Sequence, residues 1–310
     1  MAQAPTPREE LIAAADALRL HGSKAAAARA LSLRESTFKS RINAARLEGI
    51  DIPEPVKFSP PGRKETDLYD GVILIASDAH YFPGEPSTAH RAFVRFCKRM
   101  KPAIVVMNGD VLDAATISRH PPIGWNHLPS VKEELDVCQE RLGEIAKAAF
   151  KAKKLWPLGN HDARFETKLA TVAPEFKDVK GISLSDHFAD WTPCWSLHVN
   201  DDLVIKHRLK GGLHAPSNNA LWAGKSIVTG HLHAQTVREI TDYTGTRWGV
   251  DTGCLADVFG PQFAYMEDNP RGWRSGFCVI TYRDGRLLTP ELVRVIEEGL
   301  VEFRGELISV

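Results

Sequence analysis

Apolar residues in most of the chain form short, continuous runs that are separated by stretches with helical spacing. Three early runs predict buried strands, at 72–76, 103–107 and 155–158. The spacing between them predicts one helix over 89–100 and a long one over 131–151. After Trp191 the pattern changes to shorter strands, which are expected at 196–199, 203–206, 226–229, 237–240, 248–251 and 277–282. This order predicts an α/β protein in which helices cover a mixed sheet system.

The first fifty residues differ from the rest, because their pattern predicts helices alone. Apolar residues recur at helical spacing over 8–20, 24–31 and about 35–48, and Ser23 is placed to cap the second helix. The apolar positions of the first and third helices are Leu11, Ile12, Ala15, Leu18, Phe38, Ile42 and Ala45.

Four prolines fall within the polar stretch 51–67, which is therefore not expected to form regular structure. Three parts are predicted on this basis. They are a helical module at 1–50, a linker at 51–70 and an α/β domain at 71–310.

Composition excludes some classes of protein. The 310 residues include 39 Lys and Arg against 39 Asp and Glu, so a uniformly basic polyanion binder is excluded. No apolar run approaches the roughly 20 residues of a membrane span, and the start of the chain does not resemble a secretory signal. The five scattered cysteines lack CxxC spacing, which argues against a disulfide framework and a structural zinc ribbon. We expect a cytoplasmic protein without a membrane partner, in the host cytoplasm if a phage encodes it.

Polar residues that can bind metals follow directly after five of the predicted strands. The segments are 77–80 (SDAH), 108–113 (NGDVLD), 159–162 (GNHD), 206–207 (KH) and 230–233 (GHLH). Ligands of open α/β sheets bind beyond the carboxyl ends of the strands, so these segments are expected to converge on one site. Carboxylates, imidazoles and a carboxamide, with no thiolate, suit divalent Mn, Fe or Zn.

Each segment alone has an ordinary structural explanation. Asp78 could cap the turn that follows it, 108–113 could be a polar loop, and His207 could be a satisfied core histidine. The GHLH segment is more specific, since alternation along a strand would put His231 and His233 on one side. The ordered set of five, each at a strand end, favours a metal site.

In this order the five segments resemble the signature motifs of the calcineurin-like metallophosphoesterase superfamily, over roughly residues 71–255. The resemblance implies a four-layer α/β/β/α sandwich with two divalent metal ions, among which Mn²⁺ is favoured and Fe or Zn is an alternative. The implied ligands are Asp78, His80 and His233 for the first metal, Asn160, His207 and His231 for the second, and Asp110 for both. Two departures leave the substrate open, because Tyr81 replaces a common glycine and Arg208 follows the solitary histidine.

Such a ligand set suits the hydrolysis of phosphate esters. Two-metal sites hold their cations about 3.5–4 Å apart, and here only Asp78 and Asp110 would oppose two divalent charges. The site would therefore stay positive and attract phosphate. A water held by both metals would lose a proton near neutral pH and attack phosphorus as a metal-bridging hydroxide.

The resemblance makes His161 the catalytic histidine, which would give a proton or a hydrogen bond to the leaving oxygen. Asp113 is expected to orient this imidazole and raise its pKa, with a helix-start cap as the structural alternative. The expected substrate-binding residues are Arg164, Arg119 and His120. Arg164 could equally be a solvated surface arginine, and the other two could be solvated loop charges.

The N-terminal helices resemble a helix-turn-helix DNA-binding module of the resolvase or Fis type, carried by the stretch AAARALSLRESTFKSRI. The resemblance implies DNA contacts from Arg34, Thr37, Lys39, Ser40 and Arg41, near the start and outer side of the third helix. Ser32 replaces the usual turn glycine, and Arg34 replaces the usual capping residue. An Ala-rich bundle that serves oligomerisation or docking is the alternative.

The zero net charge is a cancellation between these parts. Residues 1–50 contain eight basic and five acidic side chains, which is a modest basic footprint, and the remaining chain is correspondingly acidic. We expect a two-metal phosphodiesterase or nuclease that hydrolyses DNA, with a phage DNA-processing role as one setting. The alternatives are a phosphomonoesterase or protein phosphatase, and a DNA-binding regulator with a residual phosphoesterase site.

Overall fold

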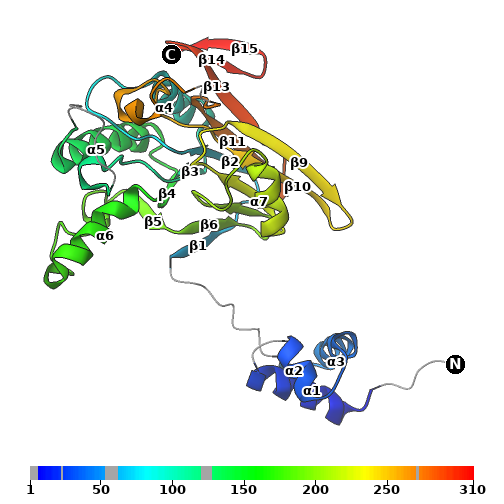
Figure 1. Cartoon of the computed structure of the whole chain (residues 1–310). Coiled ribbons are helices and arrows are strands. Elements are labelled where there is room, and N and C mark those ends of the chain that lie inside the picture. Colours follow the sequence, from blue (N-terminus) through cyan, green and yellow to red (C-terminus); the bar gives the residue numbers. More distant parts are fainter. Residues whose placement is uncertain (1–5, 22–23, 53–61, 120–127, 270–271) are drawn as a thin grey trace. The chain divides into compact units, whose positions relative to one another are not determined.

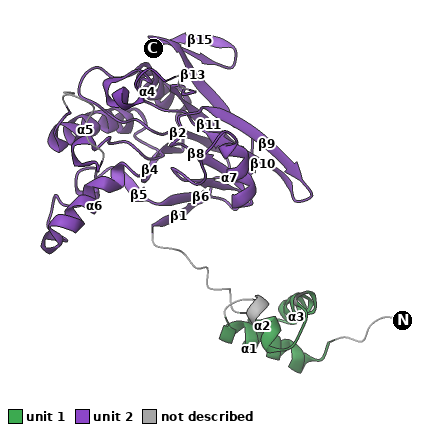
Figure 2. Cartoon of the chain, viewed as in Figure 1, with its two compact units in different colours: residues 1–60 green, residues 61–310 purple. Residues whose placement is uncertain are grey.

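The computed structural model describes residues 6–21, 24–52, 62–119, 128–269 and 272–310. The chain divides into two compact units, Met1–Pro60 and Pro61–Val310 (Figure 2). Within the described residues, the helices are all too short or too polar to cross a membrane.

The first unit contains α1 (Arg8–His21), α2 (Lys24–Ala30) and α3 (Glu35–Leu47) (Figure 1). Its core is formed by buried residues of all three helices: Ala14, Ala17, Leu18, Ala27, Ala28, Phe38 and Ile42. The predicted apolar faces are confirmed except at Ile12, which is 43% exposed.

The turn between α2 and α3 carries both departures from the helix-turn-helix pattern. Ser32 has a φ of 54°, in the left-handed region where glycine is favoured. Arg34 is the N-cap residue of α3, and its side chain makes no capping hydrogen bond. Ser32 therefore has a backbone conformation that suits the glycine it replaces, and α3 begins without a side-chain cap.

The second unit is built on two mixed sheets. The strands of the larger sheet are β2 (Gly71–Ala76), β3 (Ile104–Met107), β4 (Lys153–Pro157), β5 (Thr192–Cys194), β11 (Gly276–Arg283), β12 (Arg286–Leu287), β13 (Glu291–Glu297), β14 (Leu300–Phe303) and β15 (Glu306–Ser309). Their order is β15-β14-β13-β11-β2-β3-β4-β5, with β12 paired to β11.

The strands of the smaller sheet are β1 (Arg63–Thr66), β6 (Ser196–Val199), β7 (Leu203–Ile205), β8 (Ser226–Thr229), β9 (Thr236–Asp242) and β10 (Gly245–Asp251). Their order is β1-β6-β7-β8-β10-β9. The α-helices of this unit are α4 (Thr88–Met100), α5 (Val131–Ala148), α6 (Asp162–Val172) and α7 (Ala215–Ala223).

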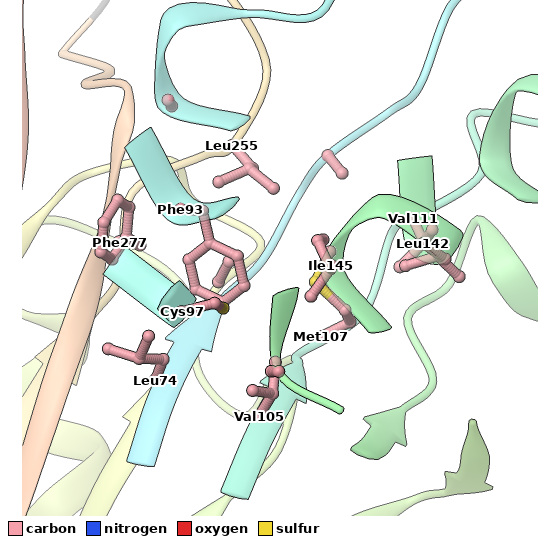
Figure 3. Close-up of a cluster of buried hydrophobic side chains, with 14 of the residues drawn as sticks. Leu74, Phe93, Cys97, Val105, Met107, Val111, Leu142, Ile145, Leu255 and Phe277 are labelled. Atoms are coloured by element: carbon pink, nitrogen blue, oxygen red, sulfur yellow. The ribbon is translucent and has the colours of Figure 1, made fainter. Parts of the chain in front are cut away.

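Side chains of β2 alternate between two cores, as the period of a strand requires. Leu74 belongs to the core shown in Figure 3, together with Phe93 of α4 and Ile145 of α5. Its neighbours Ile73 and Ile75 belong instead to the core that β2 shares with strands of the smaller sheet. The continuous apolar run therefore reflects a strand that is buried on both faces.

The outer face of the smaller sheet is covered by α7. Ala220 of this helix is buried against Val204 of β7 and Ile227 of β8. The layers are thus helices, larger sheet, smaller sheet and helix. The predicted α/β class with a four-layer α/β/β/α sandwich is confirmed, and the helical N-terminal part is present.

The expected linker at 51–70 is wrong for part of its length. Arg63–Thr66 form strand β1, which pairs in parallel with β6 at the edge of the smaller sheet. A short polar strand has no apolar pattern to predict it, since the partner strand supplies its hydrogen bonds. Residues 53–61 of the expected linker lie outside the described residues.

Parallel pairing brings the five polar segments together. Strands β2, β3 and β4 pair in parallel, as do β7 and β8 of the other sheet. The segments at 77–80, 108–113 and 159–162 follow the first three strands, and His207 and 230–233 follow the other two. Both sheets therefore contribute to one edge of the sandwich, as expected from the rule for open sheets.

Candidate metal centre

The first cluster is centred on the Asp78 carboxylate, which is fully buried. Its Oδ2 accepts a hydrogen bond of 2.8 Å from the backbone N–H of His231. Its Oδ1 lies 3.1 Å from Nε2 of His233 and 4.0 Å from Nε2 of His80. Ligand atoms of Asp78, His80 and His233 all lie within 4.8 Å of one another, so these three predicted ligands meet at one point.

The second cluster is centred on Asp110 in the same manner. Its Oδ1 accepts a hydrogen bond of 2.8 Å from the backbone N–H of His161, and its Oδ2 lies 3.0 Å from Nε2 of His207. Ligand atoms of Asp110, His207 and His231 also lie within 4.8 Å of one another. Nε2 of His207 is 3.9 Å from Oδ1 of Asp78, so the two clusters adjoin.

Five of the predicted ligands have left-handed backbone conformations. The φ angles are 52° at Asp78, 38° at His80, 50° at Asp110, 72° at His231 and 56° at His233. Residues other than glycine rarely adopt such angles. Those that do are concentrated at functional sites, where a strained backbone is part of the geometry. The expectation that strand alternation aligns the GHLH histidines is therefore wrong, because both lie after β8 and serve different clusters.

The side-chain atoms that face these clusters fit a pair of metal ions. His80 and His207 use Nδ1 in hydrogen bonds to Asp113 Oδ1 and Asn108 O, of 3.0 and 2.8 Å. Their Nε2 atoms point to the clusters, where that of His207 faces Asp110 Oδ2 at 3.0 Å. Nε2 of His80 and Oδ1 of Asn160 are buried without a hydrogen-bond partner. Ligating histidines commonly donate their other N–H to such acceptors. Divalent cations would give the orphaned atoms partners, and the donor set suits Mn, Fe or Zn.

The electrostatics also favour cations between the carboxylates. Burial alone would raise the pKa of Asp78, but His233 and His207 lower it to about 2. Burial alone would lower the pKa of His207, but Asp78 and Asp110 raise it to about 10. The carboxylates therefore stay ionised and stabilise positive charge at this edge of the sandwich.

Two glycines of the motifs are required by close packing. A Cβ atom at Gly159 would overlap the carboxylate and backbone nitrogen of Asp110. A Cβ atom at Gly230 would overlap Ser77 Oγ and Asp78 Oδ2. These glycines let neighbouring segments approach the two carboxylates, which explains why each precedes a predicted ligand.

Asp162 is a supporting residue that the sequence reasoning missed. Its carboxylate accepts backbone hydrogen bonds from Asp110, Val111, Leu112 and Gly159, of 2.8 to 3.1 Å. It thereby holds the segment after β3 against the segment after β4. Its position in the GNHD segment could have indicated this role, because an acidic residue that is buried there needs several hydrogen-bond donors.

The predicted catalytic histidine lies beside Asp113. Nδ1 of His161 is 2.8 Å from the backbone oxygen of Asp113 and 3.1 Å from its Oδ1. Burial alone would lower the pKa of His161, but the hydrogen bond to Asp113 and the charge of Asp110 raise it. Asp113 also accepts a hydrogen bond from His80, so it contacts two imidazoles rather than the one expected.

Arg164 is half-buried and is not a solvated surface arginine. It donates hydrogen bonds of 2.9 Å to the backbone oxygen of Asp113 and 3.1 Å to Nε2 of His161. The expected phosphate contact of Arg164 stays a prediction. Arg119 is exposed just after the 3₁₀ helix Ala115–Ile117, and His120 lies outside the described residues, so their substrate contacts also stay predictions.

The predicted DNA-contacting residues of α3 do not all face solvent. Arg34, Thr37, Lys39 and Ser40 are exposed. Arg41 is an exception, because it is half-buried and forms an ion pair with Glu10 of α1. Its guanidinium joins α3 to α1, and its DNA contact stays a prediction.

No protein-family model matches the chain, and no curated protein matches it. Among solved structures, the chain is similar to a single-residue mutant of Vps29 from Entamoeba histolytica, with 13% identity and a TM-score of 0.41, over 77% of this chain and 99% of that one. Wild-type Vps29 in complex with zinc, from the same organism, gives 12% identity and a TM-score of 0.38, over 77% and 98%. A serine/threonine phosphatase from Saccharomyces cerevisiae, with similarity to human phosphatase PP5, has 12% identity and a TM-score of 0.38, over 86% of this chain and 98% of that one.

The two-sheet sandwich and the buried His/Asp clusters have the arrangement that the resemblance to calcineurin-like metallophosphoesterases led us to expect. This conclusion rests on the sheet order, the buried ligand clusters and the ordered motifs. At such low identity and TM-scores, the similar structures do not bear on substrate or partner.

Proposed function

We propose that the protein is a two-metal phosphodiesterase that hydrolyses DNA. The observation that carries the proposal is the pair of adjoining clusters, in which buried carboxylates face imidazole nitrogens, while Nε2 of His80 and Oδ1 of Asn160 are buried without a hydrogen-bond partner. Two divalent ions, when bound, supply Lewis acidity and lower the pKa of a bound water. Mn²⁺ is the favoured ion, and Fe or Zn is the alternative, because the same donor set suits all three.

The metal ligands would come from both clusters. Asp78, His80 and His233 would hold one ion and Asp110, His207 and His231 the other, with the orphaned Asn160 oxygen as a further ligand of the second. Asp110 would bridge both, as the resemblance implies, since Nε2 of His207 lies 3.0 Å from Oδ2 of Asp110 and 3.9 Å from Oδ1 of Asp78.

His161 would protonate or hydrogen-bond the leaving oxygen. Its Nε2 faces the second cluster, 3.9 Å from Oδ2 of Asp110, while its Nδ1 is held by Asp113. Positioned general acids of this kind contribute about 10²- to 10⁴-fold to rate. Arg164 donates a hydrogen bond to the same Nε2. Its guanidinium would therefore have to move away from Nε2 when substrate occupies the site.

DNA is the proposed substrate because of the first unit. Its third helix exposes Arg34, Thr37, Lys39 and Ser40 after a helix-turn-helix-like turn. Basic and polar residues at the start of such a helix contact phosphates and base edges. A linked DNA-binding module would raise the local concentration of substrate at the metal centre.

The test is hydrolysis by the full chain after EDTA treatment and titration with Mn²⁺, Fe²⁺ or Zn²⁺. We expect the bis-aryl phosphate to be favoured over the mono-aryl phosphate, and nucleotide release from single- or double-stranded DNA. Asp110→Asn should abolish both activities and metal binding. Asp136→Asn is the matched control, since Asp136 is an exposed residue of α5 paired with Lys132.

Two outcomes would redirect the assignment. A preference for the mono-aryl phosphate, with no cleavage of DNA, would favour a phosphomonoesterase. Activity that survives EDTA would refute the two-metal mechanism altogether.

A further inference from the structure

One stretch of the second unit has an unusual charge pattern. Between Asp202 and Glu239 there is no acidic residue, although five basic ones occur: Lys206, Arg208, Lys210, Lys225 and Arg238. Asp and Glu account for 39 of the 310 residues, so a stretch of this length would ordinarily contain several. This stretch includes the proposed ligands His207, His231 and His233.

The middle of this stretch also exposes large apolar side chains beside its cations. Trp222 is 69% exposed, Leu213 is 91% exposed and Leu221 is 53% exposed. Arg208 and Lys210 are exposed as well. An exposed aromatic ring such as Trp222 beside cations is typical of surfaces that bind single-stranded nucleic acid.

Lys210 and Trp222 are held together by a buried side chain. Asn219 of α7 is 1% exposed, and its Oδ1 accepts a hydrogen bond of 2.9 Å from the backbone N–H of Lys210. The Lys210 ammonium then lies 3.5 Å from the centre of the Trp222 ring. Because Trp222 is still 69% exposed, most of the indole surface stays open to solvent.

The distance to the metal centre is short. Lys210 follows the proposed ligand His207 by three residues, which can span at most about 11 Å. Arg208 is closer still, because it directly follows His207 in the chain. A strand that places a phosphate at the metals can therefore reach Arg208, Lys210 and Trp222.

We propose that residues 208–222, named here the strand-binding segment, bind an unpaired polynucleotide strand that extends from the scissile phosphate. Arg208 and Lys210 contact its phosphates, and Trp222 stacks on a base. An unpaired strand is specified because a base must leave its own stack to lie on an exposed indole. This inference rests on the proposed phosphodiesterase function and names the strand that its site accepts.

Photocrosslinking tests the inference without turnover. The full chain, kept in EDTA, is irradiated with 5-iodouracil-substituted 12-mers of DNA or RNA, or with the same DNA as duplex, and crosslinked peptides are mapped. We expect the single strands to crosslink at Trp222 and the duplex to crosslink there much less. Crosslinks confined to residues 1–60 would overturn the inference, as would equal crosslinking of the duplex.

Kinetics supply a second, independent readout. For Trp222→Ala we expect the ratio of kcat/KM for a single-stranded oligonucleotide to that for a bis-aryl phosphate to fall at least about 10-fold. Trp222→Phe should restore most of the ratio, because a phenyl ring still stacks. Trp195→Ala is the matched control, since Trp195 is 53% exposed outside this segment and should keep the wild-type ratio.

The outcomes separate this inference from the proposed function. A wild-type chain that hydrolyses small diesters but no polynucleotide refutes the DNA substrate, while the crosslinking result still decides where a strand binds. A Trp222→Ala variant with an unchanged ratio and an altered sedimentation coefficient would show that the segment is a protein interface, which overturns the inference.

Discussion

The imidazoles of His80 and His161 lie edge to face with ring centroids 4.7 Å apart, and one carboxylate oxygen of Asp113 serves both. That oxygen is 3.0 Å from Nδ1 of His80 and 3.1 Å from Nδ1 of His161. A proposed ligand of the first metal and the proposed general acid are therefore positioned by the same group. Turnover and metal affinity should therefore both depend on Asp113.

We expect Asp113→Asn to lower both turnover and metal affinity. Removing the charge weakens the hydrogen bonds that orient His80 and His161, and loss of such supporting partners typically costs about 10- to 100-fold in metal affinity or activity. Metal titration by calorimetry and steady-state kinetics would measure the two effects. Asp136→Asn should change neither, and a fall in turnover with intact metal affinity would mean that Asp113 acts on His161 alone.

His161→Ala should lose about 10²- to 10⁴-fold in kcat for substrates with poor leaving groups, while its metal content stays at the wild-type level. The loss should be smaller for an aryl phosphate diester, because an aryl oxide leaves without a proton. Metal analysis together with kinetics on DNA and on the bis-aryl ester would check this pattern. A variant that has lost its metals would disprove the assigned role.

The strands that could be predicted from the sequence are those whose own residues carry a clear apolar pattern. The apolar run of β2 is buried on both faces, so it could be recognised as a strand from its residues alone. β13 was missed because its residues are mostly half-buried or exposed, and its pairing with β11 and β14 decides its structure. Pairing of this kind is a tertiary effect that overrides local pattern.

The same distinction applies to the candidate site. Ligand residues at strand ends were predictable because the parallel sheet rule converts sequence position into spatial convergence. The double role of Asp113 was not predictable, since it depends on where His80 and His161 lie relative to each other. The ion pair of Arg41 with Glu10 was missed for the same reason, because helical position alone does not show which neighbour a side chain contacts.

We expect Gly159→Ala to weaken metal binding at least about 10-fold. The added methyl group would overlap the Asp110 carboxylate and backbone, so the carboxylate must move from its place beside His207. Gly143→Ala is the matched control, because a Cβ atom there meets nothing within 4 Å inside α5. It should stabilise the helix by about 0.5–1 kcal/mol. Wild-type metal affinity in Gly159→Ala would contradict the packing argument.

The second unit should lose stability as pH falls from about 6.5 to about 4, in part because of His90. This residue is 1% exposed and hydrogen-bonds to Tyr81 and Glu144. Burial lowers its pKa to about 4, despite the hydrogen bond to Glu144. The unfolded chain therefore binds a proton over this range before the folded protein does, and the loss is at most about 3 kcal/mol.

Urea denaturation in EDTA at pH 7 and pH 4.5 would measure this dependence on pH. His90→Gln should be less stable at pH 7 and should show a shallower loss of stability on acidification than the wild type. His214→Gln should keep the wild-type dependence, because His214 is exposed. An unchanged slope in His90→Gln would assign the acid sensitivity to other groups.

The first unit should bind DNA through the exposed start of α3, and a double substitution tests this in the full chain. Arg34→Gln with Lys39→Gln removes two exposed cations without touching the buried core. If both contact phosphates, the salt dependence of binding should fall by about one unit of slope per lost contact, with weaker affinity for every sequence. Fluorescence anisotropy over a range of salt concentrations would measure it, and hydrolysis of the bis-aryl phosphate should not change.

Arg41→Gln is a useful contrast, since loss of its ion pair with Glu10 should lower the unit's stability and leave the salt slope unchanged. Equal slopes for the double variant and the wild type would mean that these helices serve docking or oligomerisation instead.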